Sequence, residues 1–290
     1  MSAERVDALL PLREDVHREK LLQAKALILC ALPYRRIETP SVTRYARLGR
    51  DSRLVVTYTS ILAGVPLPYG ADRALFAWIQ TKAYGDGYVA FDSLTDFFEA
   101  FGIGRGGRDY EAFRGRLNRL QSLAISLAVE TPSDVRRLSL HPIRRSFTPQ
   151  SPHEASTLLQ EEGSPQLLLV RDRTRYGFQL DPDFHAYLRA NPVPLPLALM
   201  RFFHNRPQAW DFAAFVLYRS YAARNLAQVS FEELEQVLGG NDSYSRRLKA
   251  RYVSILEEIR VVYPDLPARF LPRRQGLLIV PWRPSLPSSD

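Results

Sequence analysis

Two stretches of this 290-residue sequence match each other at a constant offset, and this internal repeat constrains the fold more than any other feature. Phe231 lies 140 positions after Phe91, and the same offset relates apolar residues on either side. The matched pairs are Leu75 with Phe215, Trp78 with Tyr218, Val89 with Val229, Leu94 with Leu234 and Phe97 with Val237. Two occurrences are too few for a solenoid, so the sequence predicts two copies of one supersecondary unit.

Each copy has the same predicted order of elements. An apolar helix (71–84 and 208–223) precedes a short β-prone segment (88–91 and 228–231) and a short helix (94–101 and 231–238). Ser230 and Glu233 form a capping-box pattern at the second short helix. A turn, a longer helix and strands follow, which is the order of a winged helix. We therefore predict a mainly helical α+β fold with two tandem winged-helix domains.

The rest of the chain is assigned around these copies. Residues 1–60 are predicted as a lead-in, with a helix over 13–32, an irregular basic stretch over 34–53 and a strand that begins at Leu54. The first domain covers 61–192, with strands over 124–130, 135–143 and 175–181 and a polar insert near 148–164. The proline-rich stretch 190–198 is predicted as the linker. The second domain covers 193–284, and 285–290 is predicted as a disordered tail.

A glycine run at 102–107, GIGRGG, has the G-x-G-x-x-G order of a dinucleotide-binding turn. That turn follows a strand, whereas the residues before Gly102 have a helical pattern that ends at a glycine. We therefore predict no cofactor here and assign the run to the turn of a helix-turn-helix. This turn places Arg105 and Arg108 at the N-terminus of the next helix, where backbone N–H groups favour a phosphate.

The longer helix of each copy is a candidate recognition helix. In the second copy Leu248, Tyr252, Ile255 and Ile259 have the spacing of an inward face. The bases gather toward the N-terminal half, the part that enters the major groove in such helices. The predicted DNA contacts there are Tyr244, Arg246, Arg247, Lys249 and Arg251, with Arg273 and Arg274 at the wing of the following hairpin.

In the first copy Phe113, Leu117 and Leu120 form the inward face, and Arg108, Arg116 and Arg119 share one flank. That flank is predicted to contact DNA. A structural or dimer-forming face is the alternative, because Asp109 and Glu111 reduce the positive charge at the front of this helix.

Charge and composition agree with a polyanionic partner. The formal net charge is +8, and the 39 basic residues are mostly arginine, which suits bidentate contact with phosphate or guanine. The single cysteine, Cys30, excludes a disulfide within the chain and points to a reducing compartment. The N-terminus lacks the layout of a signal peptide, and no early apolar run is long enough to span a membrane.

Enzymatic chemistry is not indicated. The five histidines show no metal-ligand spacing, so no metal is predicted. Asp181 and Asp183 lie near His185, but carboxylates at a strand-to-helix turn more often cap the helix. We therefore expect no catalytic residues and no cofactor, and an enzyme that depends on a nucleotide is the least favoured alternative.

Several segments resemble the RepA-type plasmid replication initiator family over about residues 60–284. They are VPLPYGADRALFAWIQTKA, SLTDFFEAFGIGRGGRDYEAFRGRLNRLQSLAISL, NPVPLPLALMRFFHNRPQAWDFAAFVLYRSYA, VSFEELEQVLG and LLIVPWRP. The resemblance implies a cytoplasmic bacterial protein that binds repeated plasmid origin sequences (iterons) and opens double-stranded origin DNA. It also implies a host initiator ATPase and the replicative helicase as partners, a homodimer, and repression of the protein's own gene. The alternative is a winged-helix transcriptional regulator with no replication role.

Overall fold

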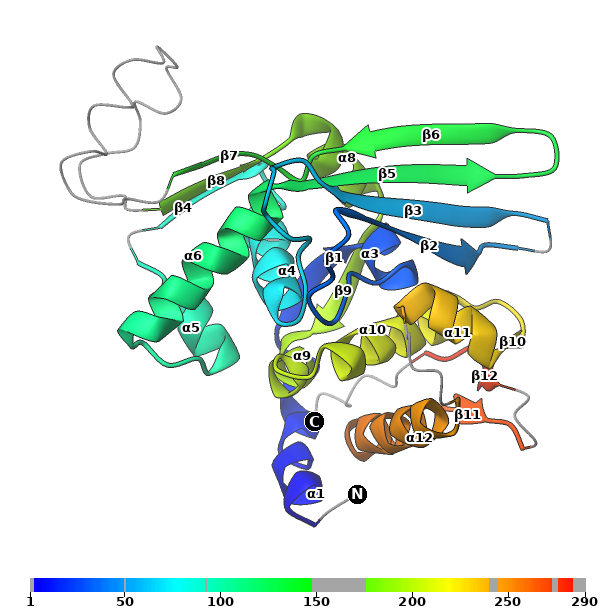
Figure 1. Cartoon of the computed structure of the whole chain (residues 1–290). Coiled ribbons are helices and arrows are strands. Elements are labelled where there is room, and N and C mark those ends of the chain that lie inside the picture. The colour runs from blue at the N-terminus through cyan, green and yellow to red at the C-terminus, as the bar shows by residue number, and fades with distance from the viewer. Residues whose placement is uncertain are drawn as a thin grey trace, which may run out of the picture.

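The computed structural model describes residues 3–49, 51–91, 93–147, 176–239, 245–272 and 276–283. Helices and small antiparallel sheets alternate along the chain, so the predicted α+β class is confirmed (Figure 1). The predicted polar insert near 148–164 and the predicted tail 285–290 lie outside these residues. The boundaries between the predicted domains stay predictions.

The first copy of the repeat forms one helix-and-sheet unit. Its elements are α4 (Asp72–Lys82), β4 (Tyr88–Phe91), α5 (Thr95–Phe101), α6 (Gly107–Gln121), β7 (Ile143–Phe147) and β8 (Tyr176–Leu180). The three strands are ordered β4-β8-β7, so the last strand lies in the middle. Trp78, Phe97 and Phe113 belong to the aromatic core between the helices and this sheet.

The second copy has the same order of elements, except that in the first copy two strands of a different sheet, β5 (Leu123–Glu130) and β6 (Val135–Leu140), come between α6 and β7. The elements of the second copy are α10 (Pro207–Ala222), β10 (Ala227–Val229), α11 (Phe231–Leu238), α12 (Ser245–Val262), β11 (Arg269–Phe270) and β12 (Leu277–Ile279). The strands are ordered β10-β12-β11, again with the last strand in the middle. The Ser230 hydroxyl accepts a hydrogen bond from the Glu233 N–H (3.1 Å), as the capping pattern predicts. The repeat in the sequence therefore corresponds to a repeat of topology.

A four-stranded sheet, which the sequence reading did not anticipate, covers the upper side of the molecule in Figure 1. It consists of β2 (Ser41–Arg47), β3 (Arg53–Ser60), β5 (Leu123–Glu130) and β6 (Val135–Leu140), in that spatial order. The prediction of an irregular stretch over 34–53 is wrong for 41–47. This segment pairs with β3 along its whole length, and the Thr43 and Thr57 hydroxyls hydrogen-bond across the pair (3.0 Å).

The N-terminal segment differs from the predicted single helix over 13–32. It forms α1 (Ala3–Leu9), α2 (Leu12–Asp15), β1 (Lys20–Ala24) and α3 (Lys25–Leu29). β1 pairs with β9 (Pro192–Pro196), so the stretch predicted as a linker is a strand. Leu22 and Ala24 donate their N–H groups to Thr81 Oγ1 (2.7 Å) and Gln80 Oε1 (2.8 Å) of α4. This pairing over a long sequence distance outweighs the local helical pattern.

Between β8 and α10 lie α8 (Pro182–Ala190) and α9 (Leu197–Phe203). Asp181 caps α8, because its carboxylate accepts a hydrogen bond from the Asp183 N–H (3.0 Å). The predicted capping role is confirmed. His185, one turn later, places Nε2 2.9 Å from the backbone oxygen of Tyr84.

A buried ion pair joins the first helices of the two units. Arg73 of α4 donates to Asp211 of α10 at 2.9 Å, and their side chains are 2% and 5% exposed. The Arg73 guanidinium also donates to the backbone oxygens of Gly70, Leu32 and Pro33. An arginine whose donors are satisfied in this way fixes three segments relative to each other.

Candidate nucleic-acid interface

The turn between α5 and α6 depends on its glycines. Gly102 ends α5 with a φ of 62°, in the left-handed region that favours glycine. Asp109 Oδ2 accepts a hydrogen bond from the Gly106 N–H (3.0 Å), and a Cβ at Gly104 would lie 2.7 Å from the same oxygen. A helix, rather than a strand, precedes the run, as the sequence pattern predicts. The glycines thus let Asp109 fold back over the turn and cap α6.

Arg105 and Arg108 both lie on the surface at this turn, which agrees with their predicted position. Arg105 pairs with Glu99 of α5, and both side chains are more than half exposed. Exposed ion pairs of this kind contribute little to stability, so Arg105 can leave Glu99 and contact another anion with little loss of stability. Arg108 is exposed in the first turn of α6.

Arg116 and Arg119 do not share a solvent-facing flank with Arg108. Arg119 donates two hydrogen bonds to the buried carboxylate of Asp72 (2.7 and 2.8 Å), and Arg116 approaches the same carboxylate at 4.0 Å. The two arginine side chains are only 17% and 20% exposed. The geometry gives them the task of holding α6 against α4, which corrects the predicted common flank. A DNA contact by either of them stays an unsupported prediction.

The exposed side of α6 instead carries Arg108, Arg114 and Asn118 together with Glu111. Sequence reasoning did not select Arg114, because a helical projection alone does not show which flank Asp72 covers. It also did not select Arg144 and Arg145, which are exposed on β7. β7 lies against α6, where Gln121 donates to Ser146. Arginine and asparagine are the residue types that make bidentate contacts with guanine and adenine.

α12 is the corresponding helix of the second unit. Tyr252, Ile255 and Ile259 are buried, so the predicted inward face is confirmed for these three residues. Lys249 lies 5.8 Å from the centre of the Phe231 ring, and Arg251, which is exposed, donates to Gln208 of α10. Arg246 and Arg247 belong to the first turn of α12, but their side chains lie outside the described part. Tyr244, Arg273 and Arg274 also lie outside it, so all five stay predictions.

The end of α11, just before α12, is set by a contact with the four-stranded sheet. Gly239 has a φ of 76°, and a Cβ there would overlap the guanidinium of Arg44 from β2. The Ala31 N–H donates to the backbone oxygen of Val237 (2.8 Å) at the same place. Sheet and N-terminal segment together fix where α11 ends.

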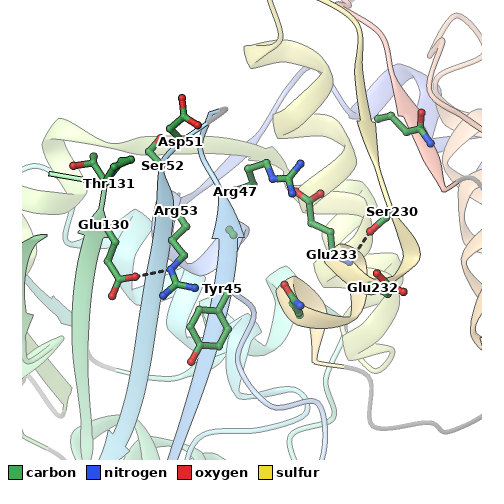
Figure 2. Close-up of a pocket in the computed structure, with 14 residues that line it drawn as sticks. Tyr45, Arg47, Asp51, Ser52, Arg53, Glu130, Thr131, Ser230, Glu232 and Glu233 are labelled. Carbon is green, nitrogen blue, oxygen red and sulfur yellow. Dashed lines mark hydrogen bonds and ion pairs between the residues drawn. The ribbon is translucent and has the colours of Figure 1, made fainter. Parts of the chain in front are cut away.

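A polar pocket of about 830 Å³ lies between the β2–β3 hairpin and α11. Figure 2 shows Arg53 paired with Glu130 on one side and Arg47 pointing toward Glu233 on the other. Burial raises the pKa of the Glu233 carboxyl, and the guanidinium groups of Arg47 and Arg219 oppose this rise. The lining carries four carboxylates (Asp51, Glu130, Glu232 and Glu233) against two arginines (Arg47 and Arg53), so its excess negative charge does not favour a phosphate.

Other chemistry-bearing groups do not form a site in the described part of the chain. No three His, Cys, Asp or Glu side chains gather there as metal ligands. Cys30 is buried, and burial raises the pKa of its thiol. No helix within the described ranges is both long enough and apolar enough to cross a bilayer.

Comparison with solved structures identifies proteins of similar fold. No family model and no curated protein matches the chain. A crystal structure of a selenomethionine derivative of domains 2 and 3 of RctB is 14% identical with a TM-score of 0.50, over 81% of this chain and 81% of that one. A second structure of RctB domains 2–3 is 15% identical with a TM-score of 0.47, over 87% and 94%. The chain therefore shares its overall fold with domains 2 and 3 of RctB.

Proposed function

We propose that this chain is a replication initiator that binds double-stranded DNA at an origin. The proposal is carried by the duplicated unit with a base-bearing helix in each copy, within a fold shared with RctB domains 2 and 3. RctB is a replication initiator of the Vibrio chromosome II. The resemblance of the sequence to RepA-type initiators supports the same role by a separate route.

Both units are proposed to be winged helices. Each has the order helix, strand, helix, helix and then two strands of its own sheet, the last of them in the middle of that sheet; in the first unit β5 and β6 of the four-stranded sheet come before these two strands. α6 and α12 would then be the recognition helices, and the β7–β8 and β11–β12 hairpins the wings.

DNA contacts follow from this assignment. The N-terminus of α6, with Arg105 and Arg108, is suited to a phosphate, while Arg114 and Asn118 occupy the side that can face base edges. Arg144 and Arg145 extend the positive charge onto the first wing. In the second unit the proposed contacts are Tyr244, Arg246, Arg247, Lys249 and Arg251, with Arg273 and Arg274 on the wing.

We also propose a more specific biological role for the chain. The target is a set of iterons in a plasmid origin, bound so that adjacent DNA opens and a host initiator ATPase and replicative helicase are recruited. The chain acts in the bacterial cytoplasm, forms a homodimer in one of its states and represses its own gene. It performs no catalysis itself.

Footprinting of the purified chain on the DNA that flanks its own gene tests the proposal. We expect protection of directly repeated sites beside an AT-rich tract. A plasmid deleted for the gene should also fail to replicate. If that plasmid replicates with no other initiator, the proposed role is wrong.

Two variants test which part of the second unit reads sequence. Arg247→Ala should lower affinity for the footprinted site by about 1–3 kcal/mol and relax specificity if the side chain contacts a base edge. Arg273→Ala should weaken binding to specific and random duplexes alike if it contacts only phosphate. Equal losses on both DNAs for both variants would mean that α12 does not read the site.

A transcriptional regulator with the same fold is the second candidate. It is favoured if footprinting shows a lone palindrome at a promoter, and plasmid maintenance does not need the gene. The same two experiments therefore separate the two functions.

A further inference from the structure

The edge strand β6 is unusually open. Residues 135–139 are all exposed, and Val135 and Leu138 are 42% and 41% exposed. The strand order β2-β3-β5-β6 puts β6 at the end of the sheet, and within the described residues no further strand pairs with it (Figure 1). An exposed edge with apolar side chains can accept an added strand.

An apolar pocket lies directly under this edge. Its volume is about 240 Å³, and its walls include Leu54, Leu127 and Leu138. Leu127 pairs with Leu138 across β5 and β6, so both side chains point to the same face of the sheet. A strand added beside β6 would place every second side chain over that face, and the pocket has room for a large apolar one.

The rim of the pocket is positive. Lys25, Arg136 and Arg137 line it together with Tyr187 and Asn191, and no carboxylate does. Arg136 pairs with Asp134, but these side chains are 86% and 53% exposed, so the pair contributes little. The complementary ligand is an extended chain that alternates apolar and acidic residues.

Two other occupants fit less well. In a second copy of this chain, antiparallel pairing of β6 with β6 would gather four arginines in one short ribbon, and β6 itself carries no carboxylate to pair with them. Nucleic acid would satisfy the cations, but a phosphate backbone does not fill an apolar pocket beneath a strand edge.

We propose that the β6 edge and its pocket bind a partner protein through an extended acidic segment with apolar anchors, by strand addition. This surface is separate from α6, α12 and the two wings. A partner could therefore dock while the chain is on DNA.

Fluorescence anisotropy with two labelled hexapeptides, DLEIDL and KLKIKL, tests the charge requirement on the full chain. We expect saturable binding of DLEIDL only. The Lys25→Glu/Arg136→Glu double variant should lose about tenfold or more in affinity for DLEIDL and should gain affinity for KLKIKL. The matched control, Arg18→Glu/Arg224→Glu, reverses two exposed charges elsewhere and should bind DLEIDL like the wild type.

Two further probes test the strand and the pocket. DLEIDL methylated on alternate backbone nitrogens should bind much more weakly, because it cannot complete the ladder. Leu138→Ser should also weaken DLEIDL binding, with circular dichroism and the unfolding midpoint confirming that the variant is folded. Affinity for the footprinted DNA should stay unchanged in these variants, so failure here would be distinct from failure of the proposed function.

Three results would overturn the proposal. The first is no saturable binding of DLEIDL, or equal losses in the double variant and its control. The second is displacement of the peptide by random duplex DNA, which would make the rim part of the nucleic-acid interface. The third is a wild-type dimer in sedimentation that the Lys25→Glu/Arg136→Glu variant abolishes, which would assign the edge to a second copy.

Discussion

Gly239 shows how one residue connects the two halves of the molecule. It ends α11 in the left-handed region, and the half-buried guanidinium of Arg44 from β2 occupies the space that a side chain would need. The Nε atom of Arg44 has no hydrogen-bond partner among the described atoms, while the carboxylate of Asp211 attracts its charge. A side chain at position 239 would therefore strain the backbone and displace Arg44 of the sheet.

We expect Gly239→Ala to destabilise the fold by about 1–3 kcal/mol, because it adds strain at a positive φ and displaces Arg44. Gly102→Ala is the matched control, since Gly102 also has a positive φ (62°) but its nearest neighbour is the movable end of exposed Arg201 at 3.2 Å. Urea unfolding should show the larger loss for Gly239→Ala. Equal losses would mean that the contact with Arg44 has no energetic weight.

Asp211 makes a second prediction, which concerns pH. Burial raises the pKa of its carboxyl from 3.8 to about 6, although Arg73 opposes the rise. The folded state then binds the proton more tightly than the unfolded state. The stability that this group contributes is present below about pH 4 and is lost as the pH rises through about 6.

Asp211→Asn removes this titration. The wild type should therefore lose stability relative to the variant as the pH rises from 4 to 6. Above the pKa of Asp211 the difference in their free energies of unfolding should become constant. Denaturant titrations at several pH values measure it. A difference that is constant over this range would mean that Asp211 titrates alike in both states.

At the scale of the element, α6 carries two kinds of arginine that the structure separates. Arg114 is exposed, whereas Arg119 donates hydrogen bonds to the buried carboxylate of Asp72. We expect Arg114→Ala to leave the unfolding midpoint nearly unchanged and to weaken DNA binding. Arg119→Ala should cost about 1–3 kcal/mol of stability, because a buried carboxylate loses its partner.

Anisotropy with the footprinted duplex, beside urea unfolding of the same samples, checks this pair of variants. Under conditions where both variants are folded, Arg119→Ala should bind DNA more nearly like the wild type than Arg114→Ala does. The reverse order would restore Arg119 to the interface and remove α6 as the helix whose exposed side faces DNA.

Most elements of the repeated units could be predicted from sequence, because their apolar spacing and caps are local signals. β7 could not, since the strand predicted over 135–143 divides at His141 and Pro142 into β6 and β7. Ser230 with Glu233 and the glycine after α5 mark helix ends that the structure contains. β1, β2 and β9 could not be predicted, because their strand character comes from partners far along the chain. The same difference between local and long-range signals applies to the candidate nucleic-acid interface. The inward face of α12 was recognisable, but the burial of Arg116 and Arg119 depends on Asp72 of another helix.

At the scale of the whole molecule, buried contacts connect the two units, so they are not structurally independent. The Arg73–Asp211 pair is buried between α4 and α10, and the β1–β9 ribbon ties the N-terminal segment to the stretch between the units. Removing one partner of a buried ion pair costs about 3–5 kcal/mol, since the other charge stays buried. The pair should therefore matter for how the two units unfold together.

We expect the two units of the wild type to unfold in one transition. Tryptophan fluorescence of Trp78→Phe would follow the second unit, which keeps Trp210 and Trp282, and that of the double variant Trp210→Phe/Trp282→Phe would follow the first unit, which keeps Trp78. The two urea midpoints should coincide. Adding Arg73→Ala to each variant should separate them, and midpoints that still coincide would show that the pair is not what couples the units.

The proline pattern of β9 has a consequence for how the protein behaves when concentrated. Pro192, Pro194 and Pro196 occupy every second position, so the edge of β9 that faces away from β1 offers no N–H donor along these residues. Another chain cannot extend that ribbon into a growing intermolecular sheet. Strand-mediated self-association is blocked at this edge by covalent structure, a protection that neither salt nor pH can remove.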